Sequence, residues 1–166
     1  MIKPLFQNIV ILINGSEASI HAAQYGILLS KLYRCNLKAV YVVDTASLKQ
    51  LTLSKFFVAD ESAMYEENLQ NDGKRYLDYV AELGKAKGVK IETELRKGAV
   101  WSEVILAADE MKAGLILLGG FQSEMNSSKV EKHDAVSSSS MEILLHANCS
   151  VLVVREKMVE QLYKLA

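Results

Sequence analysis

The chain has 166 residues, of which 50% are hydrophobic and 23% charged, with 19 lysines and arginines against 20 aspartates and glutamates. This length and composition indicate one globular domain that buries a core of its own. Because the formal net charge is only −1, nothing draws the chain as a whole toward nucleic acid or an anionic membrane, and we expect neither as a partner.

Cys35 and Cys149 are far apart in the chain and follow no metal-ligand spacing, so we predict no metal site and interpret both as free thiols in a reducing compartment. The apolar run at residues 9–13 is too short for the core of a signal peptide. A transmembrane helix would need about 18 consecutive apolar residues, and the sequence has no such stretch. We therefore expect a cytoplasmic protein.

Short apolar runs alternate along the chain with longer segments of helical periodicity. Runs that are nearly continuous in Ile, Leu and Val are typical of strands covered on both faces, whereas the alternating run VKIETEL indicates an edge strand. Strands are predicted at residues 8–13, 37–43, 89–95, 115–118 and 150–154, and helices at 17–33, 61–87, 100–112 and 140–147. This order predicts an α/β fold, namely a single-domain, doubly wound, five-stranded parallel sheet with helices on both faces.

The helical spacing also predicts which side chains face the core. The first helix is expected to bury Ala18, Ala22, Tyr25, Leu29 and Leu32, and the long second helix Leu69, Tyr76, Val80 and Leu83. We assign residues 1–157 to the domain, with a short helical piece in the connection at 44–60 and a flexible polar loop at 122–136. The tail at 158–166 has helical spacing, and it either docks on the domain or on a partner, or frays.

Ligands of open α/β sheets bind outside the carboxyl ends of the strands, where the strand order reverses. Glycines there let backbone N–H groups approach an anion, and the N-terminus of the following helix favours phosphate. These features predict a site for a nucleotide or phosphate, although the glycines could simply end strands and the serines simply cap a helix. The candidate residues are Asn14, Gly15, Ser16, Val42, Val43, Gly119, Gly120, Ser137 and Ser138.

Three segments of the chain, INGSEAS, RKGAVWSEVILAADEMKAGLILLGG and SSSSMEILLHANCSVLVVRE, resemble the universal stress protein family, and the resemblance spans residues 4–156. It implies a Rossmann-like fold of the adenine nucleotide alpha hydrolase type. It also implies a homodimer in which the last strand pairs across the two-fold axis, which would cover an apolar edge. The residues expected in that interface are Val151, Leu152, Val153 and Val154.

Some members of that family bind ATP through a glycine motif, and this chain departs from it. Gly119 matches the first glycine, but Gln122 replaces the second, and the loop from Gly119 to Ser137 is longer than the motif. Asn14 stands where the ATP-binding members have an acidic residue, while the backbone of Val42 and Val43 matches the segment that flanks adenine in the family.

These departures favour a non-enzymatic regulatory or protective homodimer in the stress response that acts through protein partners the sequence does not identify. We predict no catalytic residue, because the chain has no nucleophile elbow and the adjacent carboxylates Glu66-Glu67 and Asp109-Glu110 point in different directions on their helices. No cofactor follows with certainty from the sequence. The alternative is a sensor of ATP or another adenine nucleotide, and a phosphate-ester enzyme is a remote third possibility.

Overall fold

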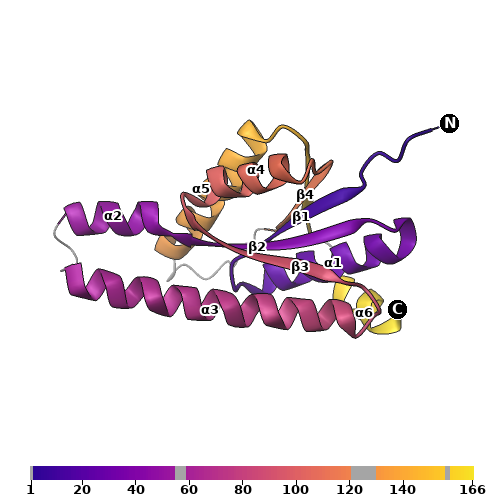
Figure 1. The fold of residues 1–166 in the computed structure, drawn as a ribbon, viewed down its shortest axis with the longest axis horizontal. Helices are drawn as coiled ribbons and strands as arrows, with labels where there is room; N and C mark the ends of the chain where they lie inside the picture. The colour runs from indigo at the N-terminus through magenta and orange to yellow at the C-terminus, as the bar shows by residue number, and fades with distance from the viewer. Residues whose placement is uncertain (1, 55–58, 121–129, 156–157) are drawn as a thin grey trace.

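The computed structural model describes residues 2–54, 59–120, 130–155 and 158–166, with side chains from residue 60 in the second range and from residue 138 in the third. Five strands form one parallel sheet in the order β3-β2-β1-β4-β5, which confirms the predicted fold class (Figure 1). The alternating run does lie at one edge of the sheet, as β3. The strands are β1 (Asn8–Ile13), β2 (Asn36–Asp44), β3 (Ile91–Gly98), β4 (Leu115–Gly119) and β5 (Ser150–Val154).

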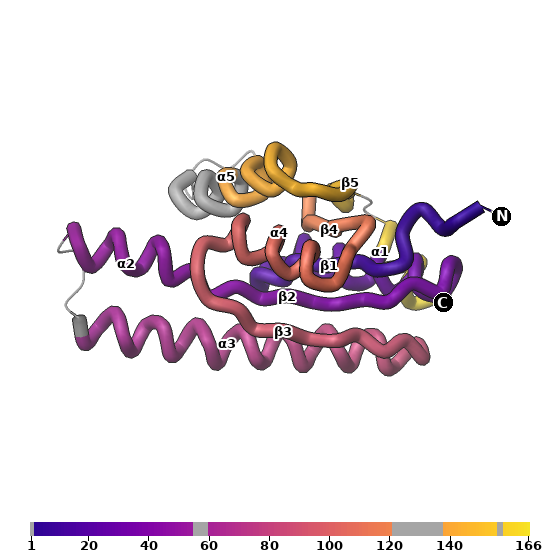
Figure 2. Tube along the Cα trace, turned by 45° about the horizontal axis from the view of Figure 1, so that its top comes forward, coloured from indigo at the N-terminus to yellow at the C-terminus, as the bar shows by residue number. Residues whose placement is uncertain are grey.

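Helices cover both faces of the sheet (Figure 2). The first core cluster joins one face of the sheet to α1, α3 and α6, and the second joins the other face to α4 and α5. The helices are α1 (Glu17–Tyr33), α2 (Thr45–Leu53), α3 (Ala59–Lys85), α4 (Val100–Glu110), α5 (Val130–His146) and α6 (Val159–Leu165).

The central strand β1 explains why its sequence is continuously apolar. Successive side chains of a strand point to opposite faces, so Ile9 and Ile11 enter the first core cluster while Val10 and Leu12 enter the second. All four are buried.

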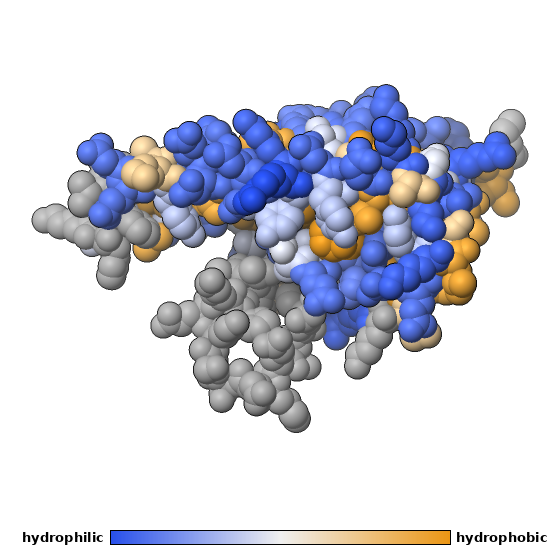
Figure 3. All heavy atoms as spheres, turned by 90° about the horizontal axis from the view of Figure 1, so that it is seen from below, coloured by the Kyte–Doolittle hydropathy of each residue, from blue (hydrophilic) through white to orange (hydrophobic). Residues whose placement is uncertain are grey.

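The outer face of the long helix α3 is hydrophilic, as Figure 3 shows from that side.

The buried face of α1 is rotated from the predicted one. Ala22, Ala23 and Gly26 face the sheet, whereas Leu32 is 72% exposed. Small side chains let the helix approach closely, since a Cβ at Gly26 would lie 2.8 Å from Cδ1 of Ile11. The larger apolar residues therefore flank the contact instead of filling it.

The helix before β5 begins earlier than predicted. Because α5 starts at Val130, residues 130–136 of the predicted flexible loop belong to it, while residues 121–129 lie outside the described part of the chain. Ser137 and Ser138 consequently lie within α5 and not ahead of its first turn, which corrects the predicted phosphate site at that position. The run at 130–139 is polar and lacks the apolar spacing that would have revealed a helix.

The C-terminal tail docks on the domain as α6. Its Val159 and Tyr163 side chains are buried, and the Tyr163 hydroxyl donates a hydrogen bond of 2.7 Å to the Leu83 carbonyl oxygen. Of the alternatives left open for this tail, docking on the domain is the one the structure adopts.

Candidate functional site

A cavity of about 290 Å³ lies at the carboxyl ends of β1 and β2, between α2 and α3. This is the low end of the size range of small-molecule sites, and mostly apolar walls with a few polar groups are typical of such sites. The lining residues are Leu12, Ile13, Asn14, Tyr41, Val42, Asp44, Ser47, Leu48, Leu51, Tyr65, Leu69 and Val100.

The site combines residues that the sequence predicted with residues that it did not. Asn14 and Val42 line the cavity, and Val43 lies next to it as a buried core residue. Leu48 and Leu51 from α2, and Leu69 from α3, were not predicted. The signal that could have found the α2 pair is their spacing of three residues within the connection at 44–60.

Asn14 is held by a tight turn at the end of β1. Its side-chain oxygen accepts hydrogen bonds from the Ser16 backbone N–H (3.0 Å) and from the Ser16 hydroxyl (2.6 Å). Gly15 has a φ of +80°, and a Cβ there would stand 2.7 Å from Cε2 of Tyr76, so this turn requires glycine. Because the Asn14 oxygen is engaged, its NH₂ group is what Asn14 offers to a ligand.

Asp44 ends β2 and places α2 beside the cavity. Its carboxylate accepts bonds from the Ser47 backbone N–H (3.0 Å) and the Ser47 hydroxyl (2.7 Å), and so caps the N-terminus of α2. One turn of helix later, Leu48 is buried against the cavity. The residue that ends the strand thus also orients the apolar wall.

Tyr41 forms part of the cavity wall as a neutral phenol. Its ring stacks on that of Tyr76, with centroids 6.3 Å apart. Burial is the larger cause that raises the pKa of Tyr41 above its ordinary value, and the nearby negative charge of Asp72 is the second. The hydroxyl therefore stays protonated across the physiological pH range.

Close packing explains both Gly119, which ends β4, and Gly120, which follows it. A Cβ at Gly119 would stand 2.6 Å from the Ala18 carbonyl carbon, and one at Gly120 would stand 2.5 Å from the Val154 carbonyl oxygen. Neither glycine lines the cavity. At this position the structure matches the simpler interpretation, in which glycine is needed where a strand ends against a neighbouring backbone.

Among the described residues no group of histidine, cysteine, aspartate and glutamate is arranged to hold a metal ion. In the same residues, no helix is both long enough and apolar enough to cross a membrane. The candidate site is thus built from apolar walls, a turn and backbone at the strand ends.

The strand order reverses beside β1, which lies between β2 and β4. A cavity outside the carboxyl ends of such strands defines the class of doubly wound α/β proteins that hold a ligand at the reversal point. Within that class, the model of the universal stress protein family matches residues 5–155. The chain belongs to the universal stress protein family.

Individual members resemble the chain over almost its full length. A universal stress protein of Methanocaldococcus jannaschii is 29% identical over 157 residues, covering 92% of this chain and 84% of that protein. A crystal structure of a family member from Burkholderia pseudomallei has a TM-score of 0.69 at 22% identity, covering 93% of this chain and 99% of that one. A family protein of Arabidopsis thaliana, solved with AMP bound, has a TM-score of 0.62 at 11% identity, with coverages of 93% and 94%.

Proposed function

We propose that this protein is a regulatory universal stress protein that binds an adenine nucleotide in the cavity at the ends of β1 and β2 and does not turn it over. The observation that carries the proposal is the position of this cavity, at the reversal point of the sheet and with largely apolar walls. The similar Arabidopsis protein, solved with AMP bound, indicates which nucleotide to test first.

In this proposal the base occupies the cavity. Its faces would contact Leu48 and Leu51, and its polar edge would meet the NH₂ group of Asn14 and the backbone of Val42. The phosphates would extend toward the turn at Gly15 and the N-terminus of α1, where the helix dipole favours negative charge.

The residues around the cavity favour binding without catalysis. Of the described residues that line it, none is a histidine or a lysine, and the Asp44 carboxylate is engaged by Ser47. A general base needs to reach the proton that it removes. We therefore propose that occupancy, not turnover, carries the signal, and that the signal passes to a protein partner.

We also propose that the protein is a homodimer joined along β5. This strand forms an edge of the described sheet, with β4 as its neighbour. Val151, Leu152 and Val153 are only partly buried there, and pairing with a second copy would cover them. The free thiols Cys35 and Cys149 support our placing the protein in the cytoplasm.

Calorimetric titration with AMP tests the nucleotide proposal, with two tryptophan variants of α2 as the comparison. Leu51 lines the cavity and is 37% exposed, so a larger side chain can be accommodated there. The indole of Leu51→Trp should fill part of the cavity and weaken AMP binding by about tenfold or more. Leu53 is 75% exposed and does not line the cavity, so Leu53→Trp should bind AMP like the wild type. A wild type that binds no nucleotide, or two variants that lose affinity equally, would contradict the proposal.

A further inference from the structure

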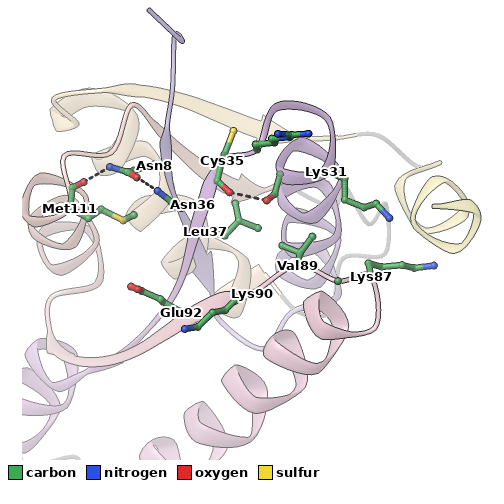
Figure 4. Close-up of a pocket in the computed structure, with 13 residues that line it drawn as sticks. Asn8, Lys31, Cys35, Asn36, Leu37, Lys87, Val89, Lys90, Glu92 and Met111 are labelled. Carbon is green, nitrogen blue, oxygen red and sulfur yellow. Dashed lines mark hydrogen bonds between the residues drawn. The ribbon is translucent and has the colours of Figure 1, made fainter.

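A second hollow opens at the opposite end of the sheet, where the parallel strands begin. Its volume is about 760 Å³, and its floor includes Cys35 and Leu37 of the α1–β2 segment together with Val89 (Figure 4). We refer to this hollow as the basic groove. It lies at the amino ends of the strands, whereas the proposed nucleotide site lies at their carboxyl ends.

Four cationic side chains and a single carboxylate line the basic groove. Lys31 and Arg34 come from the end of α1, and Lys87 and Lys90 come from the turn between α3 and β3; the carboxylate belongs to Glu92. In the described part of the chain, none of the four cations forms an ion pair with an aspartate or glutamate side chain. The groove therefore carries a local excess of positive charge on a protein whose net charge is −1.

The neutral donors in the groove are already committed to the fold. The Asn36 amide donates to the Asn8 side-chain oxygen (2.9 Å), and the Asn8 amide donates to the Met111 carbonyl oxygen (2.8 Å). The Ser30 hydroxyl donates to the Cys35 carbonyl oxygen (2.8 Å). These neutral groups are thus partly engaged within the fold, and the charged side chains are the strongest donors that the groove offers to a ligand.

Two of the cations already hold the negatively polarised end of a peptide segment. The ammonium groups of Lys31 and Lys87 donate to the backbone oxygens of Ala166 and Lys164, each at 3.3 Å, and Figure 4 shows both side chains pointing toward α6. The C-terminal end of a helix carries partial negative charge. Each ammonium has further N–H groups to donate, and no described group accepts from the side chains of Arg34 and Lys90.

We infer that the basic groove is a docking surface for an acidic peptide segment of a partner protein. The hollow is wide and lined from several elements, whereas a site for a small anion encloses its ligand and converges donors on it. Nucleic acid binding needs a run of cations that neutralises several phosphates, and here Glu92 interrupts the positive charge. A flexible acidic segment needs only complementary charge along an open surface.

Fluorescence anisotropy with a labelled glutamate-rich peptide tests this inference in the full chain. The double variant Arg34→Glu/Lys90→Glu should weaken binding by about tenfold or more, because two attractive charges become repulsive. The matched control Lys49→Glu/Lys74→Glu makes the same change in net charge at exposed positions of α2 and α3 outside the groove, and should bind nearly as the wild type does. Circular dichroism and thermal melts establish that each variant is folded.

Three results would overturn the inference: no peptide binding by the wild type in low salt, equal loss in both double variants, or tighter binding of a single-stranded oligonucleotide than of the peptide. If Arg34→Glu/Lys90→Glu does not fold, the single variant Lys90→Glu replaces it, with Lys74→Glu as its control. The result is independent of nucleotide binding, because neither Arg34 nor Lys90 lines the cavity at the other end of the sheet.

Discussion

Gly119 at the end of β4 lies against Ala18 in the first turn of α1, so that a Cβ at Gly119 would stand 2.6 Å from the Ala18 carbonyl carbon and 2.7 Å from its oxygen. The strand order reverses between the neighbouring strands β1 and β4, and this contact joins β4 to α1, the helix that follows β1. The atoms that would clash belong to the backbone, so no change of rotamer can relieve the overlap.

Gly119→Ala should therefore lower the free energy of unfolding by roughly 1–3 kcal/mol, the range typical of overpacking at a rigid contact. Urea denaturation measures this change. Because the overlap involves the backbone of Ala18, the additional substitution Ala18→Gly should not restore stability. Unchanged stability in Gly119→Ala, or full rescue by Ala18→Gly, would show that the contact is looser than described.

Lys112→Gly should stabilise the protein. Lys112 has a φ of +53°, and it follows α4 in a Schellman motif, in which the Ala113 N–H bonds to the Ala108 carbonyl and the Lys112 N–H to the Asp109 carbonyl. This left-handed conformation costs a residue with a Cβ about 1–2 kcal/mol, a cost that glycine avoids. The greater chain entropy of glycine in the unfolded state offsets part of this gain. We expect a gain of about 0.5–1 kcal/mol by chemical denaturation, and no gain from the control Lys112→Ala.

Arg96 on β3 contacts three carboxylates: Glu94 of the same strand at 2.7 Å, and Glu103 and Glu110 of α4 at 2.8 Å and 3.0 Å. Its side chain is only 13% exposed, so Arg96→Met would leave partly buried carboxylates without their partner. We expect a loss of about 2–4 kcal/mol in the free energy of unfolding.

The neighbouring residue provides the control for this substitution. Lys97 forms a single exposed ion pair with Glu66 at 3.3 Å, and Lys97→Met should cost less than about 1 kcal/mol. Equal effects of Arg96→Met and Lys97→Met would show that burial of the Arg96 cluster contributes nothing to stability.

The same cluster predicts how stability depends on pH. Burial acts to raise the pKa of Glu94, but hydrogen bonds from Arg96 and Lys38 outweigh it, and the pKa is lowered overall. A lowered pKa in the folded state gives stability that is present above the unfolded-state value, about 4.3 for glutamate, and lost as the pH falls through the folded-state value. Wild-type stability should thus fall in acid, and Arg96→Met should show a shallower fall over the same range. Parallel pH profiles would contradict this role.

Val153→Asp should disrupt the proposed dimer. It places a charge on the edge strand β5, so sedimentation velocity should show monomer or insoluble protein, whereas Leu145→Asp, at a 69% exposed position of α5, should leave the dimer intact. Hydrogen exchange of β5 amides in the wild type gives an independent measure, because pairing across a dimer axis would protect them. A monomeric wild type, or an intact dimer in folded Val153→Asp, would rule out this interface.

The sheet was predictable because β1, β4 and β5 are short, nearly continuous runs of Ile, Leu and Val, and β3 alternates between apolar and polar residues. The strands β1 and β5 begin and end where their sequences predict, and β3 is shifted toward the carboxyl end because Val89 belongs to the turn after Gly88, whose φ is +72°. Helices were harder to predict where small or polar residues decide the packing. Gly26 rotates the buried face of α1, and the polar start of α5 gives no periodicity.

In the candidate site, the sequence predicted only the residues that lie at the carboxyl ends of strands. Asn14 and Val42 were found because the carboxyl ends of parallel strands meet at one edge of the sheet. Leu51 and Leu69 come from two separate helices, and only the packing of α2 against α3 brings them to the same cavity. No spacing along one segment encodes such a pair.

The most direct test of the nucleotide proposal is an NMR titration of the ¹⁵N-labelled protein with AMP. Saturable chemical-shift changes should concentrate at the end of β1 around Asn14 and along residues 42–51, while amides beside the basic groove, such as those of Cys35 and Lys90, should stay in place. An absence of shifts at millimolar AMP, or shifts that concentrate at the basic groove, would contradict the proposal that this cavity is the nucleotide site.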